Sequence, residues 1–242
     1  MPFSIDTLVQ YREAELDCHI GARGYLYYFQ DAATHHFRGF GKGNDVIPYE
    51  YGLGWIITKY RLKVLERAPM NAQLHIETWL EPQKSPVRLR RSLRISSDGR
   101  DFALGEMELC LADTKANRVA RLSEIGFDAS VEEHVEVETP SVRRLSFDED
   151  NSFEYAYSYT VRYCDLDNNG HMNNLHYVDL VLNAFDSSFH TEHPVCEVDL
   201  EYVDQCREGD VIDVLTRIEQ GKALVIAKHQ SGSVALKAQL GF

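Results

Sequence analysis

The sequence repeats one pattern of predicted elements in its two halves, and this repeat limits the possible folds more than any other feature. In each half a strand-like stretch (residues 11–17 and 157–163) leads through a turn into an amphipathic helix (25–37 and 174–185). Four stretches with strand alternation follow each helix, at 55–64, 73–79, 87–95 and 102–111, and at 196–202, 211–217, 223–229 and 234–240. We therefore predict an α+β fold with two antiparallel sheets in tandem, each wrapped around one helix.

An acidic segment without helical or strand periodicity separates the halves. Residues 126–150 contain Pro140 and have the composition of a connection between domains. We place an N-terminal domain at residues 1–125, a linker at 126–150 and a C-terminal domain at 151–242.

The composition is that of a globular protein and disfavours two classes. Against 38 Asp and Glu there are 25 Lys and Arg, a formal net charge of −13, which argues against a nucleic-acid binder. Apolar stretches such as 223–227 are far shorter than the roughly 20 residues of a membrane-spanning helix. The first residues lack the features of a signal or transit peptide, and the five scattered cysteines show no paired spacing. We expect a cytoplasmic protein with reduced thiols.

Polar side chains concentrate in residues 165–174, immediately before the second helix, where two carboxylates, four amides and an imidazole occur together. Asp165, Asp167 and Asn169 match the first positions of an EF-hand calcium loop. The twelfth position, which needs a bidentate Glu, is His176, and a strand precedes the stretch. We therefore reject calcium and expect no metal.

A second interpretation of this stretch is structural. The Asn169-Gly170 pair predicts a tight turn, because Gly takes a positive φ without strain. Asn173 or Asn174 would then cap the helix that follows. Under this hypothesis the stretch carries no chemistry.

The third interpretation is catalytic. Asp167, Asn169 and His171 alternate, so in an extended chain their side chains share one face. A His near an Asp can act as a general base or acid, and an Asn amide can position an oxygen or a water. The helix start at Asn173 and Asn174 would offer free backbone N–H groups to a developing oxyanion and so bind substrate.

The same residues resemble the signature of a known family. The run 165–177 resembles the Asp-x-Asn-x-His-x-Asn-Asn-x-x-Tyr signature of the acyl-ACP thioesterases, whose plant and bacterial members are double hotdog proteins. Residues 201–206 resemble the Glu/Asp-Tyr-Arg-Arg-Glu-Cys segment of that family. The resemblance implies a double hotdog with a catalytic C-terminal half and an N-terminal half that shapes the acyl site. It also implies hydrolysis of fatty acyl thioesters on acyl carrier protein (ACP), which ends chain elongation in fatty acid biosynthesis, with no cofactor.

The resemblance assigns roles residue by residue. Asp167, Asn169 and His171 match the catalytic Asp, Asn and His of the family. Cys206 matches a Cys once proposed as the nucleophile, and Gln205 occupies the position of a catalytic Glu in the plant enzymes. Because Gln cannot take a proton from water, the role of base falls to His171 or to another carboxylate.

Glu201 is the candidate for that carboxylate. Strand alternation places Glu201 and Gln205 on one face of the sheet and Cys206 on the other, with Leu200 and Tyr202. A Cys beside two such side chains is typical of a core. We therefore favour attack by water over an acyl-enzyme on Cys206.

The first half lacks this set of residues when the two helices are aligned without gaps. Aligning Leu26 with Leu175 places three residues without a base opposite the catalytic set, namely Cys18, Ile20 and Ala22. We expect one active site per chain. In the first half Trp55 and Trp79 would either line the acyl tunnel or belong to the ordinary core.

An acidic carrier protein requires a local concentration of positive charge. The candidate residues are Arg88, Arg90, Arg91 and Arg94 in one strand, with Arg118 and Arg121 or Arg143 and Arg144. On a half-exposed strand such a run can equally be a solvated face.

Three other activities stay open: a hotdog acyl-CoA thioesterase, a non-catalytic acyl-binding module and a dehydratase of 3-hydroxyacyl carriers. The chain would act as a monomer or a homodimer, since two tandem hotdogs already supply the pairing that single hotdogs reach by dimerising.

Overall fold

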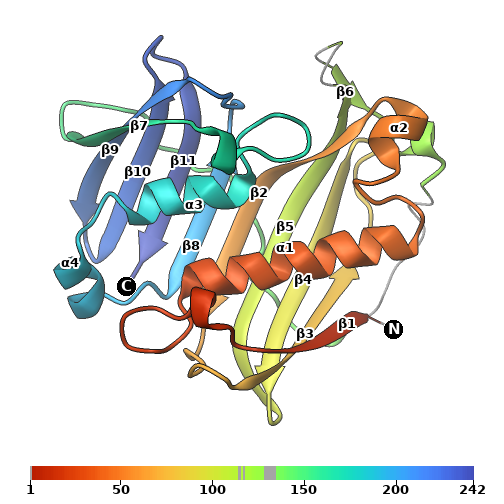
Figure 1. Ribbon diagram of the computed structural model, residues 1–242, viewed down its shortest axis with the longest axis horizontal. Helices are drawn as coiled ribbons and strands as arrows, with labels where there is room; N and C mark the ends of the chain where they lie inside the picture. The colour runs from red at the N-terminus through yellow and green to blue at the C-terminus, as the bar shows by residue number, and fades with distance from the viewer. Residues whose placement is uncertain (1, 114–115, 117, 128–134) are drawn as a thin grey trace. The chain divides into compact units, whose positions relative to one another are not determined.

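Each half of the chain forms its own antiparallel sheet with a helix lying across it (Figure 1). The computed structural model describes residues 2–113, 116, 118–127 and 135–242. By its internal contacts the chain divides into two units, which we call unit 1 (residues 1–142) and unit 2 (residues 143–242). The boundary between them lies inside the predicted linker, of which residues 128–134 fall outside the described residues.

Unit 1 follows the predicted order of one long helix and then a run of strands. Its elements are β1 (Phe3–Leu8), η1 (Tyr11–Glu13), α1 (Ala22–Gly39), α2 (Ile47–Tyr51), β2 (Gly54–Val64), β3 (Gln73–Leu80), β4 (Arg88–Ser97), β5 (Arg100–Asp113), β6 (Arg118–Ala120) and η2 (Leu122–Ile125). The strands lie in the order β1-β3-β4-β5-β2, with β6 beside β5, and all pairs are antiparallel.

Unit 2 repeats this arrangement. Its elements are β7 (Glu154–Thr160), η3 (Tyr163–Asp165), α3 (Asn174–Leu182), α4 (Ser187–Glu192), β8 (Glu197–Tyr202), β9 (Val211–Glu219), β10 (Lys222–His229) and β11 (Val234–Gly241). The strands lie in the order β7-β9-β10-β11-β8, which is the order of unit 1 element for element. The predicted α+β class and its two helix-wrapped antiparallel sheets are confirmed.

One face of the sheet in unit 1 packs against α1. The predicted stripe of this helix is buried, with Leu26 and Phe29 fully excluded from solvent. Gly105 of β5 allows the close approach, because a Cβ at this position would lie 2.7 Å from the Phe29 ring. Residues paired with Gly105 across the sheet, Leu93 and Leu62, therefore face the helix as well.

The opposite face of that sheet is covered by the described end of the connecting segment. Val142 donates its backbone N–H to the Glu106 carboxylate (3.0 Å), and the hydroxyls of Thr139 and Ser92 are 2.7 Å apart. Glu106 and Ser92 are neighbours in the register of β4 and β5. Residues 139–142 thus form part of unit 1 and are not a free tether.

Two predicted elements differ from the structure. The leading strand of unit 1 is β1, whereas residues 11–13 form a 3-10 turn in which Glu13 is buried and accepts from Arg12 Nε (2.6 Å). The prediction of a strand at residues 11–17 is therefore wrong, because its polar and apolar residues alternate in a turn that buries one carboxylate. The helix of unit 2 ends at Leu182, short of the predicted 185. None of the helices among the described residues is both long and apolar enough to cross a membrane.

Candidate active site

The stretch before α3 forms a tight loop, which we call the unit 2 loop (residues 167–171). Asp167 N–H donates to the His171 carbonyl (2.8 Å) and Gly170 N–H to the Asp167 carbonyl (3.1 Å), with Gly170 at φ 74°. Leu166 and Met172 form a β-bridge at its base. The predicted turn with a positive φ at Gly170 is confirmed, whereas the extended conformation behind the shared-face argument is wrong.

Neighbouring elements hold both ends of the unit 2 loop. On one side the buried Asp165 carboxylate accepts from Arg162 N–H (2.7 Å) and Tyr159 Oη (2.9 Å), and its backbone carbonyl accepts from Asn173 N–H (2.8 Å). The carboxylate of Asp165, the first position of the calcium pattern, is therefore used for hydrogen bonds that fix the start of the loop. On the other side Met172 N–H donates to the Cys206 carbonyl, 2.8 Å away.

The Asp167 carboxylate closes the loop from within. It accepts the backbone N–H of Asn169 (2.8 Å) and of His171 (3.3 Å), and it also accepts Nδ2 of Asn169 (3.3 Å). Asp167 therefore orients the Asn169 amide. Among the described contacts it holds the backbone of His171 and not the imidazole ring, so it fixes the position of His171 through the loop.

His171 is the buried titratable group of the loop, with 8% of its surface exposed. Its Nδ1 is excluded from solvent and has no hydrogen-bond partner among the described residues. Burial lowers the pKa of His171 below its ordinary value of 6.5, and the positive charge of Arg207 lowers it further, whereas Asp167 opposes the shift. The imidazole is therefore neutral at pH 7 and can accept a proton.

The start of α3 presents backbone N–H groups beside the loop. Asn173 is the N-cap, as predicted, and its side chain accepts from Leu175 N–H (3.0 Å). The backbone N–H of Asn174, the first residue of the helix, has no acceptor among the described residues. A developing negative charge placed here would meet a free donor and the positive end of the helix dipole.

Gln205 and Cys206 lie on the segment that follows β8. Gln205 is half-buried, and its N–H donates to the Asp204 side chain (2.9 Å). Cys206 is fully buried, and burial raises the pKa of its thiol to about 11 although Tyr177 opposes the shift. Its Sγ lies 3.8 Å from His229 Nε2. A thiol that stays protonated at neutral pH is a poor nucleophile.

Glu201 does not face the loop. Tyr202 donates its hydroxyl to the Asn174 carbonyl (2.9 Å), so Tyr202 lies on the helix face of β8 and Glu201 on the other. There the Glu201 carboxylate accepts from Leu145 N–H (2.8 Å). The prediction of Glu201 as the substitute base is wrong, because the strand ends at Tyr202 and its alternation does not extend to Gln205.

The two tryptophans of unit 1 lie on opposite faces of its sheet. Trp55 is buried against α1, stacked on Phe37 with ring centroids 4.5 Å apart. Trp79 pairs with Ser92 in the register of β3 and β4, so it faces the 139–142 segment. Of the two tryptophans only Trp55 therefore lies on the α1 face, whereas Trp79, also buried, packs on the opposite face of the sheet.

The arginines of β4 are either buried or paired with carboxylates. Arg91 is fully buried, with Nη2 2.9 Å from the His36 ring and the guanidinium over Phe37. The other three form ion pairs, Arg88 with Glu108, Arg90 with Glu106, and Arg94 with Glu77 and Asp101. The β4 run is therefore not an unpaired basic face, although Arg88 shares its partner Glu108 with Lys59.

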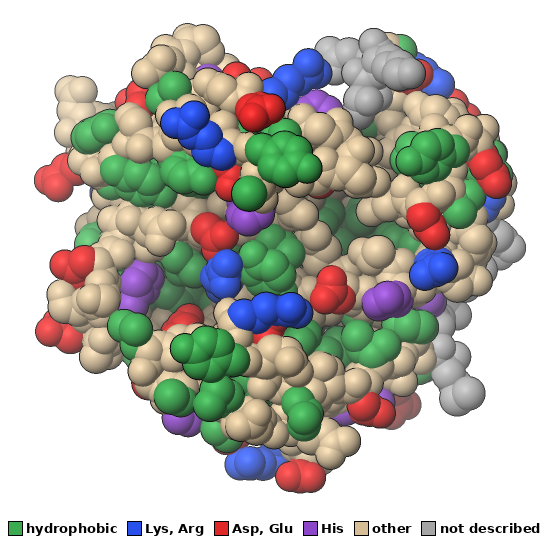
Figure 2. Space-filling view, viewed as in Figure 1, with side chains coloured by type: hydrophobic (Ala, Val, Ile, Leu, Met, Phe, Trp, Pro, Cys, Tyr) green, Lys and Arg blue, Asp and Glu red, His purple; other side chains and the backbone are tan. Residues whose placement is uncertain are grey.

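The remaining basic candidates are at least partly exposed. Arg118 forms an ion pair with Glu124, and Arg143 with Asp199. Arg121 and Arg144 are exposed and have no ion pair among the described contacts. On the face shown in Figure 2, basic side chains are scattered singly or in small groups among acidic ones.

Two residues beside the loop, Arg207 and Tyr177, were given no role from the sequence. Arg207 is exposed and its charge acts on His171, and the only signal for it was its place next to Cys206. Tyr177 accepts the backbone N–H of Cys206 (2.9 Å) and so positions the segment that holds the loop. Tyr177 ends the run 165–177 that matches the family signature, and this match was the signal for it in the sequence.

Comparisons with known proteins assign both units to domains of the same family. The model of the acyl-ACP thioesterase N-terminal domain matches residues 3–125, and that of the C-terminal domain matches residues 148–239.

Among curated relatives, a chloroplastic dodecanoyl acyl-carrier-protein hydrolase of Cinnamomum camphora is 25% identical over 233 residues, 88% of this chain and 60% of the relative. The oleoyl-acyl carrier protein thioesterase 2 of Arabidopsis thaliana is 22% identical over 216 residues, 81% of this chain and 57% of the relative. The chain thus spans about 60% of the length of these relatives.

Two solved structures share the fold. An acyl-ACP thioesterase from Bacteroides thetaiotaomicron superposes with a TM-score of 0.84 at 16% identity, covering 99% of this chain and 96% of the other. The 12:0-ACP thioesterase from Umbellularia californica also gives 0.84, at 21% identity and the same coverage.

Proposed function

Because the chain belongs to the acyl-ACP thioesterase family, we propose that it hydrolyses the thioester between a fatty acyl chain and ACP and releases the free acid, which ends chain elongation. The matched relatives are named as hydrolases or thioesterases of ACP esters. Within this chain the observation that carries the proposal is His171, buried and neutral with an unpartnered Nδ1, in a loop that leads into a helix start.

The first step is attack by water. The water oxygen bonds to the thioester carbonyl carbon while the neutral imidazole of His171 takes the water proton. The carbonyl oxygen becomes negative, and the N–H of Asn174 and the Asn169 amide stabilise it at the start of α3. Gln205 can hold the water by hydrogen bonds but cannot take its proton, so His171 is the base.

The second step expels the carrier thiol. The C–S bond breaks, its electron pair goes to sulfur, and His171 returns the proton to the thiolate. Asp167 takes part in no proton transfer; it keeps Asn169 and the backbone of His171 in place. Cys206 takes no covalent part, because its raised pKa keeps the thiol protonated.

The N-terminal domain, residues 1–125, would shape the site of the acyl chain, and residues 151–242 would carry the chemistry. Trp55, on the α1 face of the sheet in unit 1, is the aromatic side chain best placed for the first role.

The test pairs His171→Ala with His176→Ala, a half-buried histidine on α3 that faces Asp179 at 3.2 Å. With an acyl-ACP substrate we expect His171→Ala to lower kcat about 10²- to 10⁴-fold and His176→Ala to leave it within about threefold. Equal activity of wild type and His171→Ala would remove His171 from the mechanism.

The carrier is tested by supplying one acyl chain on ACP and on CoA to the wild-type protein. Faster turnover on ACP supports the proposed substrate. Faster turnover on CoA would make the protein an acyl-CoA thioesterase, and tight binding without release of acid would make it an acyl-binding module.

A further inference from the structure

Unit 1 contains a loop with the backbone conformation of the unit 2 loop, and we call it the unit 1 loop (residues 15–19). Glu15 N–H donates to the His19 carbonyl (2.8 Å), as Asp167 N–H does to that of His171 (2.8 Å). Cys18 takes the place of Gly170, with φ 62° against 74°. Its N–H donates to the Glu15 carbonyl at 2.9 Å, which repeats the bond from Gly170 to Asp167.

The anchors of the two loops correspond as well. Ala14 and Ile20 form the bridge at the base, as Leu166 and Met172 do in unit 2. Ile20 N–H donates to the Ala68 carbonyl (2.9 Å), and Ala68 N–H to the Tyr25 hydroxyl (3.0 Å). The same two bonds link Met172, Cys206 and Tyr177 in unit 2.

This correspondence corrects the gapless alignment of the helices. Glu15, Asp17 and His19, and not Cys18, Ile20 and Ala22, lie opposite Asp167, Asn169 and His171. Unit 1 therefore retains an imidazole and two carboxylates at the positions of the catalytic set.

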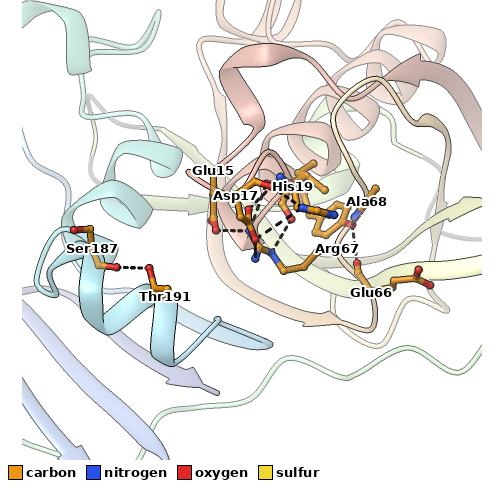
Figure 3. Close-up of polar contacts among 10 residues, drawn as sticks. Glu15, Asp17, His19, Glu66, Arg67, Ala68, Ser187 and Thr191 are labelled. Carbon is orange, nitrogen blue, oxygen red and sulfur yellow. Dashed lines mark hydrogen bonds and ion pairs between the residues drawn. The ribbon is translucent and has the colours of Figure 1, made fainter.

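Arg67 takes the position of Gln205, one residue before Ala68, and its guanidinium holds the unit 1 loop together (Figure 3). Nη1 lies 2.6 Å from the Asp17 carboxylate, and Nη2 lies 2.7 Å from that of Glu15. Nε donates to the Ile20 carbonyl at 3.2 Å. Burial alone would raise the pKa of Asp17, but the hydrogen bonds from Arg67 and from His19 N–H outweigh it and lower the pKa.

The Glu15 carboxylate fills the space at the start of α1. The N-cap of this helix is Gly21, which has no side chain to cap it. A Cβ at Gly21 would lie 1.6 Å from Glu15 Oε1, so the carboxylate occupies the volume that the Asn173 side chain takes in unit 2. A negative charge at this end of a helix is stabilised by the dipole.

The imidazole of unit 1 is also engaged within the loop. His19 Nδ1 lies 2.9 Å from the Asp17 carbonyl and 43% of the side chain is exposed, whereas His171 Nδ1 is buried without a partner. In unit 1 one ring nitrogen of the histidine is bonded within its own loop, and the Glu15 carboxylate fills the helix start that is open in unit 2.

We propose that unit 1 carries a self-occupied copy of the active site, in which Glu15, Asp17 and Arg67 fill with their own ion pairs the space that substrate takes in unit 2. The assignment of the unit 2 loop as catalytic rests on the proposed function. The copy anchors the unit 1 loop and the first turn of α1, binds no thioester and leaves one active site per chain, and Arg67 is its positioning residue.

The test is Arg67→Gln, which replaces the arginine by the residue found at the corresponding position of unit 2, Gln205. Its effect is measured by hydrogen exchange of the backbone amides. We expect exchange in residues 15–25 to accelerate about tenfold or more, since charge-assisted bonds to two carboxylates are lost, with no change in residues 167–175. The matched control is Arg100→Gln, whose exposed ion pair with Glu66 lies in the same unit, and it should change neither segment.

Unchanged exchange in residues 15–25 of Arg67→Gln would overturn the proposal. So would a fall in acyl-ACP hydrolysis in His19→Ala as large as in His171→Ala, since the unit 1 loop would then be catalytic. Should Arg67→Gln fail to fold, the charge-balanced variant Glu15→Gln, Asp17→Asn, Arg67→Gln gives the same exchange comparison. The exchange measurement does not depend on activity, so it separates failure of this proposal from failure of the proposed function.

Discussion

One tyrosine hydroxyl positions the segment that holds the unit 2 loop. Tyr177 accepts the buried N–H of Cys206 at 2.9 Å, and the Cys206 carbonyl accepts Met172 N–H at 2.8 Å, directly after His171. Tyr177→Phe removes this acceptor together with the longer bond that the hydroxyl donates to the Asp204 carbonyl (3.4 Å), and it leaves the ring in place.

The cost follows from burial. Tyr177 is 2% exposed and Cys206 is fully buried, so no water replaces the lost acceptor. A buried N–H without a partner costs about 1–3 kcal/mol, and each kcal/mol lowers Tm by about 2–4 °C in a chain of this size. Movement of the loop by a fraction of an ångström is expected to lower kcat/KM about tenfold.

Unit 1 supplies the matched control. Tyr25 is fully buried and accepts Ala68 N–H at 3.0 Å, so Tyr25→Phe should cost about the same stability. Because the unit 1 loop is not catalytic in this account, kcat/KM should stay within about twofold. Thermal unfolding and acyl-ACP hydrolysis are measured on both variants. Equal falls in kcat/KM, or none in Tyr177→Phe despite its lost stability, would refute the reasoning.

Three further predictions concern charge and the thiol. Arg207→Gln removes a positive charge that lowers the pKa of His171, so that pKa rises and the acid limb of the kcat/KM profile moves to higher pH. Cys206→Ala keeps kcat/KM within about threefold, because its protonated thiol takes no part. The loss of stability in Arg67→Gln is full above about pH 4 and shrinks as pH falls through the lowered pKa of Asp17, where its carboxylate is protonated in both states.

Each of these has a contradicting result. Arg162→Gln changes an exposed arginine near the same loop whose charge is not among the causes of the His171 shift, and its profile should match wild type. Equal profiles for Arg207→Gln and Arg162→Gln would remove the charge effect. Loss of activity in Cys206→Ala comparable to that of His171→Ala would restore the acyl-enzyme. A stability loss in Arg67→Gln that is as large at pH 2 as at pH 7 would show that the ion pair with Asp17 is not its source.

The sheet of each unit was predictable because strand alternation is a local signal that tertiary packing reinforces. All eight predicted strands after the helices correspond to strands of the structure. Alternation failed where the chain leaves the sheet: Glu201 lies on β8, but Gln205 lies beyond its end, so the inference of a shared face did not hold.

The geometry of the site depended on backbone hydrogen bonds that a pattern of residue types does not reveal. Asp167 and His171 lie next to each other because the loop closes on itself, with the backbone of Gly170 in the left-handed conformation. The copy in unit 1 was hidden because Cys18 holds the same conformation without being a glycine. His19 and His171, equally spaced from Tyr25 and Tyr177, were the signal in the sequence that the gapless alignment missed.

The central claim, one catalytic loop in unit 2 and one silent copy in unit 1, is tested most directly by the rates of acyl-ACP hydrolysis of His171→Ala and His19→Ala. We expect a loss of about 10²- to 10⁴-fold in the first variant and a rate within about twofold of wild type in the second. Retained hydrolysis in folded His171→Ala, or an equal loss in both variants, would contradict the account.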